Sequence, residues 1–400
     1  MQRSFKLSAL MVGLLGAASY THAAENDLGI YGFLSVGSSV LDNDLKNDTN
    51  GDGIVNGDDA VTLDGFDGNA GNFKQDTVLG LQIIKQINES TSATGQLVSR
   101  GTSNYDTESA WAFVTYTANP DLDMRMGRLR IPFFYYSEFL EVGYAYNWVR
   151  TPSDVYNLPF SSFDGVDMTQ RFSLGNFDGD IKLNYGRFSE TMELFGSEYQ
   201  ADLRNIAGIS LNLTRGDFGF RLSSQRAEVT FDTVADFTSD RGLDQAQAGA
   251  LNAINVLGKS ASVADDFTFK GKEGAFYGVA LTYNDGEYGL VAEGTAIEYE
   301  TGLLLDNLAW LVSGSKRFND FTVHATYSTS KDILESGDVG DVQEALSLKG
   351  EDISTILGVR YDYDAGTAIK FEVEHHDEKV HRAVDGNSAM LYSVAVDVIF

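Results

Sequence analysis

Short and long connections alternate along this chain between segments that have the pattern of β-strands, and this alternation constrains the fold more than any other feature. Segments of roughly ten residues, in which apolar and polar side chains alternate, predict sixteen strands. Every second connection is tight and carries turn-forming residues, as at 118–121, 284–287 and 364–367. The predicted strands are 28–40, 76–87, 92–101, 107–117, 122–130, 167–174, 180–188, 204–214, 218–228, 274–284, 288–299, 307–317, 321–331, 353–363, 368–377 and 390–400.

An up-and-down order of this kind puts the short turns at one end and the long loops at the other, as in a closed antiparallel β-barrel that crosses a membrane. Within 318–328, Phe321 and Val323 alternate with Thr322, so one face suits lipid and the other suits water. The last segment, which ends on Phe400, is predicted to pair with the first, because an open edge in hydrocarbon leaves backbone groups unpaired. A soluble β-sandwich or β-solenoid is the alternative, but neither explains the regular alternation of connection lengths.

The N-terminus has the features of a secretory signal. Arg3 is followed by a short apolar run at 7–18 and then by small residues that resemble a cleavage site, which predicts a removed signal peptide at 1–23 and a mature barrel at 24–400. A retained anchor is the alternative, but the run is shorter than the about 20 residues that a bilayer-spanning helix needs.

The composition argues against several classes of function. The chain has 58 acidic and 29 basic residues and a formal net charge of −29, so nucleic acid is not an expected partner, whereas cations, including divalent ones, are. It has no cysteine, which excludes thiol chemistry. His375 and His376 are adjacent on one predicted strand and therefore point to opposite faces. No nucleophile-elbow, zinc-protease or P-loop motif occurs, so we expect a protein that is not an enzyme and that requires no cofactor.

The signal, the terminal Phe400, the strand count and the segment at 124–157 together resemble the Gram-negative outer-membrane porins of the general, sixteen-stranded type. The Gly127-Arg128 step and the Ser137-Glu138-Phe139 stretch carry the most specific part of this resemblance, although a strict PEFGG-type loop motif is absent. The resemblance implies a homotrimer in the outer membrane that contacts lipid and lipopolysaccharide. It also implies a third external loop that folds into the barrel and narrows it, with carboxylates opposite a cluster of arginines.

The predicted third loop, 131–166, is richer in aromatic residues than a solvated loop needs to be, so it should pack against the inside of the barrel. The predicted constriction has Glu138, Glu141 and Asp154 on the loop, opposed by wall arginines, although ordinary loop charges are the alternative for any one of them. Arg171, Arg221 and Arg360 alternate cleanly with apolar neighbours and should face the lumen. The predicted opposing arginines are Arg128, Arg130, Arg150 and Arg171.

One assignment conflicts with simple alternation. If Met124 and Met126 face lipid, Arg128 and Arg130 would face lipid as well, where an arginine near the midplane costs about 2–4 kcal/mol. Two explanations are open: a bulge at Gly127 that changes the facing, or a subunit contact lined by the methionines.

The first external loop, 41–75, contains a motif with the spacing of a calcium-binding loop at 47–61. Oxygen-bearing ligands stand at alternate positions, and Gly53 permits the sharp bend between them. The motif is similar to half of a dockerin repeat, an EF-hand-like loop, but only one copy is present. We expect Ca²⁺ binding at the weak extracellular end, roughly 10⁻⁴ to 10⁻³ M, which would order the loop; a solvated acidic loop is the alternative. The predicted ligands are Asp48, Asn50, Asp52, Ile54, Asn56 and Asp59.

Taken together, the sequence predicts a water-filled channel for the passive diffusion of small hydrophilic solutes and ions, with a preference for cations. Two alternatives share the fold. One is a substrate-specific channel. The other is a scaffold or adhesin that uses the calcium-like loop and the long connection 229–273 to bind a partner.

Overall fold

The computed structural model describes residues 28–43, 66, 71, 73–194, 197–233, 242–346, 349–381 and 387–400. The predicted signal peptide at 1–23 and the calcium-like motif at 47–61 lie outside the described residues. None of the helices in the described part of the chain is long and apolar enough to cross a membrane.

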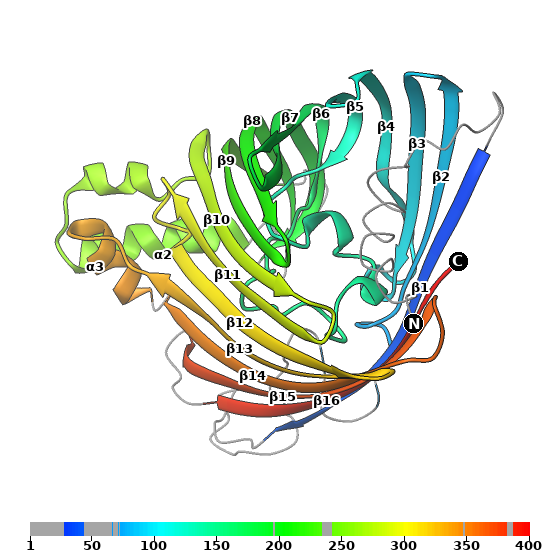
Figure 1. The fold of residues 1–400 in the computed structure, drawn as a ribbon. Helices are drawn as coiled ribbons and strands as arrows, with labels where there is room; N and C mark the ends of the chain where they lie inside the picture. Colours follow the sequence, from blue (N-terminus) through cyan, green and yellow to red (C-terminus); the bar gives the residue numbers. More distant parts are fainter. Residues whose placement is uncertain are drawn as a thin grey trace.

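Within these residues, sixteen strands form one closed barrel in which each strand pairs antiparallel with its neighbours (Figure 1). The seam joins β1 to β16, from Phe33 opposite Ile399 to Asn43 opposite Ala389. Reciprocal backbone hydrogen bonds of 2.7 and 3.0 Å between Gly32 and Phe400 complete it. The predicted sixteen-stranded closed barrel is therefore confirmed. Its strands are β1 (Leu28–Asn43), β2 (Val78–Asn88), β3 (Thr91–Arg100), β4 (Thr107–Asn119), β5 (Leu122–Arg130), β6 (Ser162–Leu174), β7 (Phe177–Leu194), β8 (Ser197–Arg215), β9 (Phe218–Thr233), β10 (Lys272–Asn284), β11 (Tyr288–Tyr299), β12 (Asp306–Phe318), β13 (Phe321–Ile333), β14 (Gly350–Asp362), β15 (Thr367–His381) and β16 (Asn387–Ile399).

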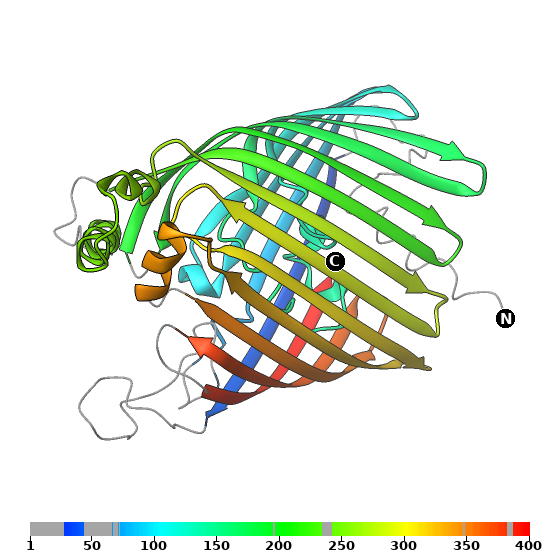
Figure 2. The same cartoon turned by 90° about the vertical axis from the view of Figure 1, so that its left-hand side faces the viewer.

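The two ends of the barrel differ, and we call them the turn end and the loop end (Figure 2). Tight hairpins close the turn end, and Gly175 and Asn319 adopt the left-handed backbone conformation that such turns require. The loop end carries α2 (Gly242–Val256), η4 (Ala261–Asp266) and α3 (Asp338–Ala345), which share a small apolar core. The short and long connections thus lie on opposite ends, as the alternation along the sequence indicates.

Several connections are shorter than predicted because the strands continue into them. β7 and β8 pair from Asp178 opposite Thr214 up to Leu194 opposite Ser197, so most of the predicted loop at 189–203 is strand. The long connection 229–273 begins only after Thr233, and loop 131–166 ends where β6 begins at Ser162. The apolar residues Phe163, Ala201 and Leu203 of these extensions are buried in one cluster, whereas the apolar residues of the outer wall are exposed, so the outward apolar alternation does not continue although the backbone pairing does.

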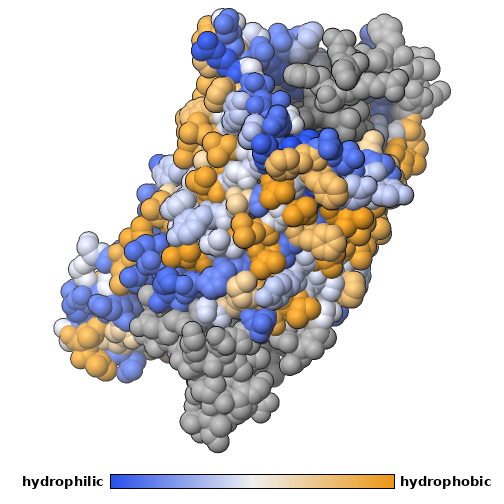
Figure 3. Space-filling model, turned by 60° about the horizontal axis from the view of Figure 1, so that its bottom comes forward, coloured by the Kyte–Doolittle hydropathy of each residue, from blue (hydrophilic) through white to orange (hydrophobic). Residues whose placement is uncertain are grey.

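Burial along the strands is the reverse of that in a soluble sheet. In β13, Val323 and Tyr327 are exposed on the outer face, whereas the alternating Thr322, His324 and Ser328 are buried inside. Apolar side chains gather across the middle of the outer wall in the view of Figure 3, with polar ones toward its ends. An outer wall with so many exposed apolar side chains suits hydrocarbon, because soluble monomers rarely expose large apolar patches.

The inward and outward directions of the β5 side chains change at the end of the strand, at Arg130, and not at Gly127. Pairing with β4 and β6 continues through Gly127 without a register shift, so a bulge at this residue, one of the two open explanations, is excluded. Met124 and Met126 are exposed, while Arg125, between them, contacts inward-facing carboxylates. The chain turns into the barrel at Arg130, the last residue of β5, whose buried guanidinium is therefore inside although alternation places it outside.

Candidate functional site

The connection between β5 and β6, residues 131–161, folds into the interior of the barrel (Figure 1); we call it the inner loop. Its contacts reach far around the wall. The backbone N–H of Tyr135 donates to Glu293 on β11 over 2.7 Å, and the Trp148 indole donates to Thr326 on β13 over 2.8 Å. The Tyr144 hydroxyl reaches the carbonyl of Ala365 in the turn between β14 and β15, at 3.1 Å. The inner loop therefore crosses the lumen toward the opposite wall.

Aromatic side chains hold the inner loop together, as its composition predicts. The rings of Phe133 and Phe134 pack on Phe276 of β10, with centroids 4.9 and 5.3 Å apart. Tyr136 lies edge-on to Trp148 at 5.6 Å. These rings and their apolar neighbours form one buried cluster with the wall, and such aromatic pairs add about 0.5–1.5 kcal/mol each beyond the area they bury.

Basic side chains of the wall bind the backbone carbonyls of the inner loop. Lys370 on β15 donates to the carbonyls of Gly143 and Trp148 over 2.7 and 2.6 Å, and it forms an ion pair of 2.8 Å with Asp397 on β16. Arg360 on β14 donates to the carbonyls of Tyr144 and Tyr146 over 2.7 and 2.9 Å. Arg221 on β9 donates to the carbonyl of Pro132 over 2.8 Å.

Arg221 and Arg360 thus lie on the inner face of the wall, where the sequence places them. Both are buried under the inner loop and engaged with its carbonyls, so they anchor the loop and are shielded from the open lumen. A charged donor to a backbone carbonyl is among the stronger hydrogen bonds in a protein.

Two of the three predicted loop carboxylates, Glu138 and Glu141, have basic partners on the wall. Glu138 pairs with Lys182 of β7 and lies 3.6 Å from Arg125 of β5. The charge of Lys182, together with that of Arg125, holds the pKa of Glu138 well below its ordinary value of 4.5, although burial opposes this shift.

Glu141 forms an ion pair of 2.6 Å with Arg100 of β3 and lies 3.4 Å from Arg130. Burial raises the pKa of Glu141, but the two guanidinium groups outweigh burial, so the pKa is lowered. Asp154, the third predicted carboxylate, is buried and accepts a hydrogen bond of 2.5 Å from Ser328 of β13.

Three of the four arginines predicted to oppose these carboxylates lie elsewhere. Arg125 and Leu129 point inward on β5, and Arg128 alternates with them. Arg128 pairs with Glu190 of β7. Arg171 lies closer to the turn end than the inner loop does, and it pairs with Asp123 at 2.6 Å.

Arg150, the third, belongs to the inner loop itself and binds the wall. It donates to Asp76 over 2.7 Å and to Ser39 and Ser393 at the seam over 2.6 and 2.8 Å. Of the four predicted arginines, only Arg130 lies beside a loop carboxylate, Glu141.

Four further basic residues that bind the inner loop were not predicted from the sequence, because their partners depend on strand register and on the path of the loop, which the sequence pattern does not reveal. They are Arg100, Arg125, Lys182 and Lys370.

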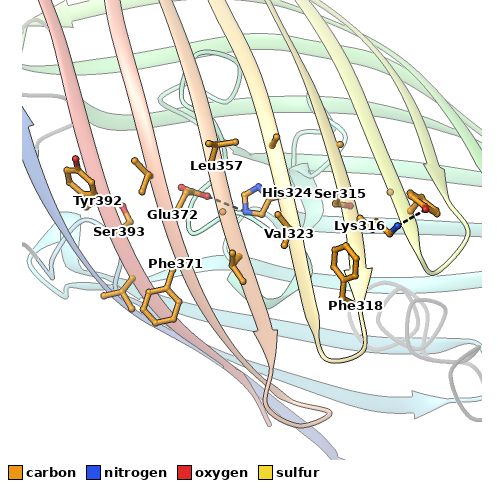
Figure 4. Close-up of a pocket in the computed structure, with 18 of the residues that line it drawn as sticks. Ser315, Lys316, Phe318, Val323, His324, Leu357, Phe371, Glu372, Tyr392 and Ser393 are labelled. Carbon is orange, nitrogen blue, oxygen red and sulfur yellow. Dashed lines mark hydrogen bonds and ion pairs between the residues drawn. The ribbon is translucent and has the colours of Figure 1, made fainter.

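A second polar group lies on the wall under the inner loop. Glu372 of β15 accepts a hydrogen bond of 3.1 Å from the backbone of Val149, and its carboxylate lies 3.8 Å from the imidazole of His324 on β13 (Figure 4). Gly358 of β14 lies between them, where a Cβ would come within 2.1 Å of the His324 ring. The outer face of the same strands is apolar and exposed, and it carries Val323 and Phe371.

No protein-family model matches this chain, and no curated protein sequence is similar to it. Solved structures are similar in fold. The outer-membrane channel DcaP of Acinetobacter baumannii has a TM-score of 0.58 at 11% identity, covering 95% of this chain and 99% of that one. The anion-selective porin from Comamonas acidovorans has a TM-score of 0.54 at 11% identity, covering 94% and 100%. The outer-membrane-expressed OmpT of Vibrio cholerae has a TM-score of 0.55 at 12% identity, covering 95% and 99%.

The topology and these likenesses define the class of fold: a closed sixteen-stranded antiparallel barrel of the kind found in outer-membrane porins. At this level of identity the likeness extends to the fold alone.

Proposed function

We propose that this protein is an outer-membrane porin: a water-filled channel for the passive diffusion of small hydrophilic solutes and ions across the outer membrane of a Gram-negative bacterium. The observation that carries the proposal is the reversed burial of the wall, with polar side chains inside and apolar ones outside, around an inner loop that brings charge into the lumen. No catalytic role is proposed.

The porin proposal also implies a route of export and a membrane environment for the barrel. A signal peptide at 1–23 would be removed during export. The apolar outer wall would then contact lipid, and the loop end would face the medium and the lipopolysaccharide.

Selectivity is proposed to arise where the inner loop faces β3, β5 and β7. Here Glu138 and Glu141 form ion pairs with Arg125, Lys182 and Arg100, so charges of both signs lie where the inner loop meets the wall. The formal net charge of −29 supports a preference for cations over the whole channel. A substrate-specific channel remains an alternative with the same fold.

In planar bilayers, the purified protein is expected to give open channels with a linear current–voltage relation and a reversal potential, under a potassium chloride gradient, that favours K⁺. The physical reason is the wet, polar lumen and the acidic excess of the chain. A reversal potential favouring Cl⁻ would contradict the cation preference and leave the channel intact. Inserted protein without measurable conductance would contradict the channel itself and favour the scaffold or adhesin.

The channel is further proposed to be a homotrimer. One of the OmpT structures with this fold is described as a trimer form, which supports the proposal. In the same bilayers a trimer should close in three equal steps.

The motif at 47–61 is proposed to bind Ca²⁺ through the oxygens of Asp48, Asn50, Asp52 and their neighbours, and so to order the first external loop. Calorimetry on the detergent-solubilised protein should show Ca²⁺ binding in the range of about 10⁻⁴ to 10⁻³ M. The Asp52→Asn variant should lose it, since this substitution removes a charged ligand. Equal Ca²⁺ affinity in the variant would show that the motif is not the site.

A further inference from the structure

At the loop end of β14 and β15, three side chains with metal-binding atoms converge on the inner wall. The ligand atoms of Asp352, His376 and Glu378 all lie within 4.8 Å of one another. Asp352 stands directly opposite Glu378 in the register of the two strands, and Ser354 stands opposite His376. Because residues two apart on a strand share a face, all four side chains project from the same face of the wall.

The histidine of this group is oriented as a metal ligand would be. The His376 side chain is only 8% exposed, and its Nδ1 lies 3.0 Å from the Ser354 hydroxyl, which is itself buried. If Nδ1 carries the proton and donates it to Ser354, Nε2 is left with its lone pair. Nε2 points toward the carboxylates, 3.8 Å from Asp352, and within the described residues it makes no hydrogen bond. An imidazole whose second nitrogen is held in this way is the usual arrangement at metal sites.

The electrostatic surroundings favour a cation. Asp352 and Glu378 bring two carboxylates to the group. Among the described lysines of the neighbouring strands, Lys331 pairs with Glu351 at 3.1 Å and Lys379 pairs with Asp377.

We propose that Asp352, His376 and Glu378 form a binding site for a divalent transition-metal ion of the Zn²⁺ type at the outer mouth of the lumen. One imidazole nitrogen with two carboxylates suits such an ion, whereas Ca²⁺ and Mg²⁺ prefer oxygen ligands alone. Zn²⁺ bonds of about 2.0–2.2 Å require the ligand atoms to close to roughly 3.5 Å of one another. Glu378 is only partly buried near the end of its strand and has room to make that movement. A fourth position remains open to water or to a passing solute.

The test is calorimetric titration of the detergent-solubilised, chelator-stripped protein with zinc chloride, on an Asp52→Asn background that removes the calcium-like loop from the measurement. One Zn²⁺ per chain is expected. The His376→Gln and Asp352→Asn variants should bind at least about 100-fold more weakly, and Ser354→Ala about 10–100-fold more weakly. His375→Gln is the matched control: His375 is the adjacent residue, but it lies on the exposed outer face, so Zn²⁺ affinity should not change.

Because binding is measured in detergent, the result does not depend on conductance, and a failed channel assay would leave this site standing. Circular dichroism and heat-modified electrophoretic mobility establish that each variant is folded. The proposal is overturned if the parent protein shows no saturable Zn²⁺ binding, if His376→Gln binds as tightly as the parent, or if His375→Gln weakens binding as much as His376→Gln.

Discussion

Replacing Lys370 with methionine is expected to loosen the inner loop from the wall by about 3–5 kcal/mol, the cost of breaking a buried ion pair by removing one partner. The substitution leaves the carbonyls of Gly143 and Trp148 without their donor and leaves the buried Asp397 carboxylate with Ser35 as its hydrogen-bond donor. Hydrogen–deuterium exchange of the backbone amides at 143–149 should rise by a factor of at least 100, since each 1.4 kcal/mol is tenfold. Current noise in open channels should rise with it.

Two further variants distinguish this explanation from a general loss of stability. Lys331→Met removes a half-exposed ion pair with Glu351, which contributes about 0–1 kcal/mol, so exchange at 143–149 should stay at the parent level. The double variant Lys370→Met with Asp397→Asn removes both buried charges and should recover part of the protection. Unchanged exchange in Lys370→Met would show that the aromatic cluster alone holds the inner loop.

Replacing Glu141 with glutamine should shift selectivity toward anions by about fivefold in the ratio of anion to cation permeability. Glu141 offsets the charges of Arg100 and Arg130, and a unit charge about 4 Å from a permeating ion contributes about 1 kcal/mol in water. Lys182→Met, which leaves Glu138 with Arg125 alone, should shift the ratio the other way. Reversal potentials under a salt gradient measure both shifts.

The matched control is Arg171→Met. Arg171 pairs with Asp123 near the turn end, away from the inner loop, and its removal should alter the ratio much less than either substitution. Equal shifts in the Arg171 and Glu141 variants would place the selective region outside the inner loop.

The pH dependence of selectivity follows from the same pairs. The pKa values of Glu138 and Glu141 are both below the ordinary 4.5, so both carboxylates stay ionised as the pH falls to that value. Their contribution to loop docking is therefore fully present above 4.5, the value in the unfolded chain, and is lost only as the pH falls through the lower folded values. The contribution of these two carboxylates to the permeability ratio should accordingly remain constant between pH 7 and about 5. A sigmoidal change centred in that interval that is present in the parent and absent from the Glu141→Gln variant would contradict the pairing of Glu141.

The barrel was predictable from the sequence because its determinants are local. Period-two alternation, tight turns at 284–287 and 364–367, and the alternation of connection lengths are each visible within a few residues, and their sum fixes the strand order. The extra length of β7 and β8 was missed because the pairing registers shift between Gly186 and Phe188 and between Arg204 and Ala207, which interrupts the outward apolar alternation.

The partners within the site were less predictable because they join distant parts of the chain. Glu138 lies on the inner loop, as its position in the sequence indicates, but its partner Lys182 lies 44 positions away, on a strand whose register sets their distance. Arg171 shares the inward alternation of its strand, yet it lies too close to the turn end to meet the inner loop. The side of the wall that a side chain faces can be predicted from the alternation within its own strand. Its position along the barrel axis depends on the registers of all the neighbouring strands together.

The inner loop leaves the wall at β5 and is fastened again at β9, β11, β13 and β15. A cylinder of hydrogen-bonded strands can flatten into an ellipse at little cost, because each hinge between strands bends only slightly. A strut fastened across the diameter opposes that deformation. The aperture of this barrel should therefore keep its outline when lateral pressure in the surrounding bilayer changes.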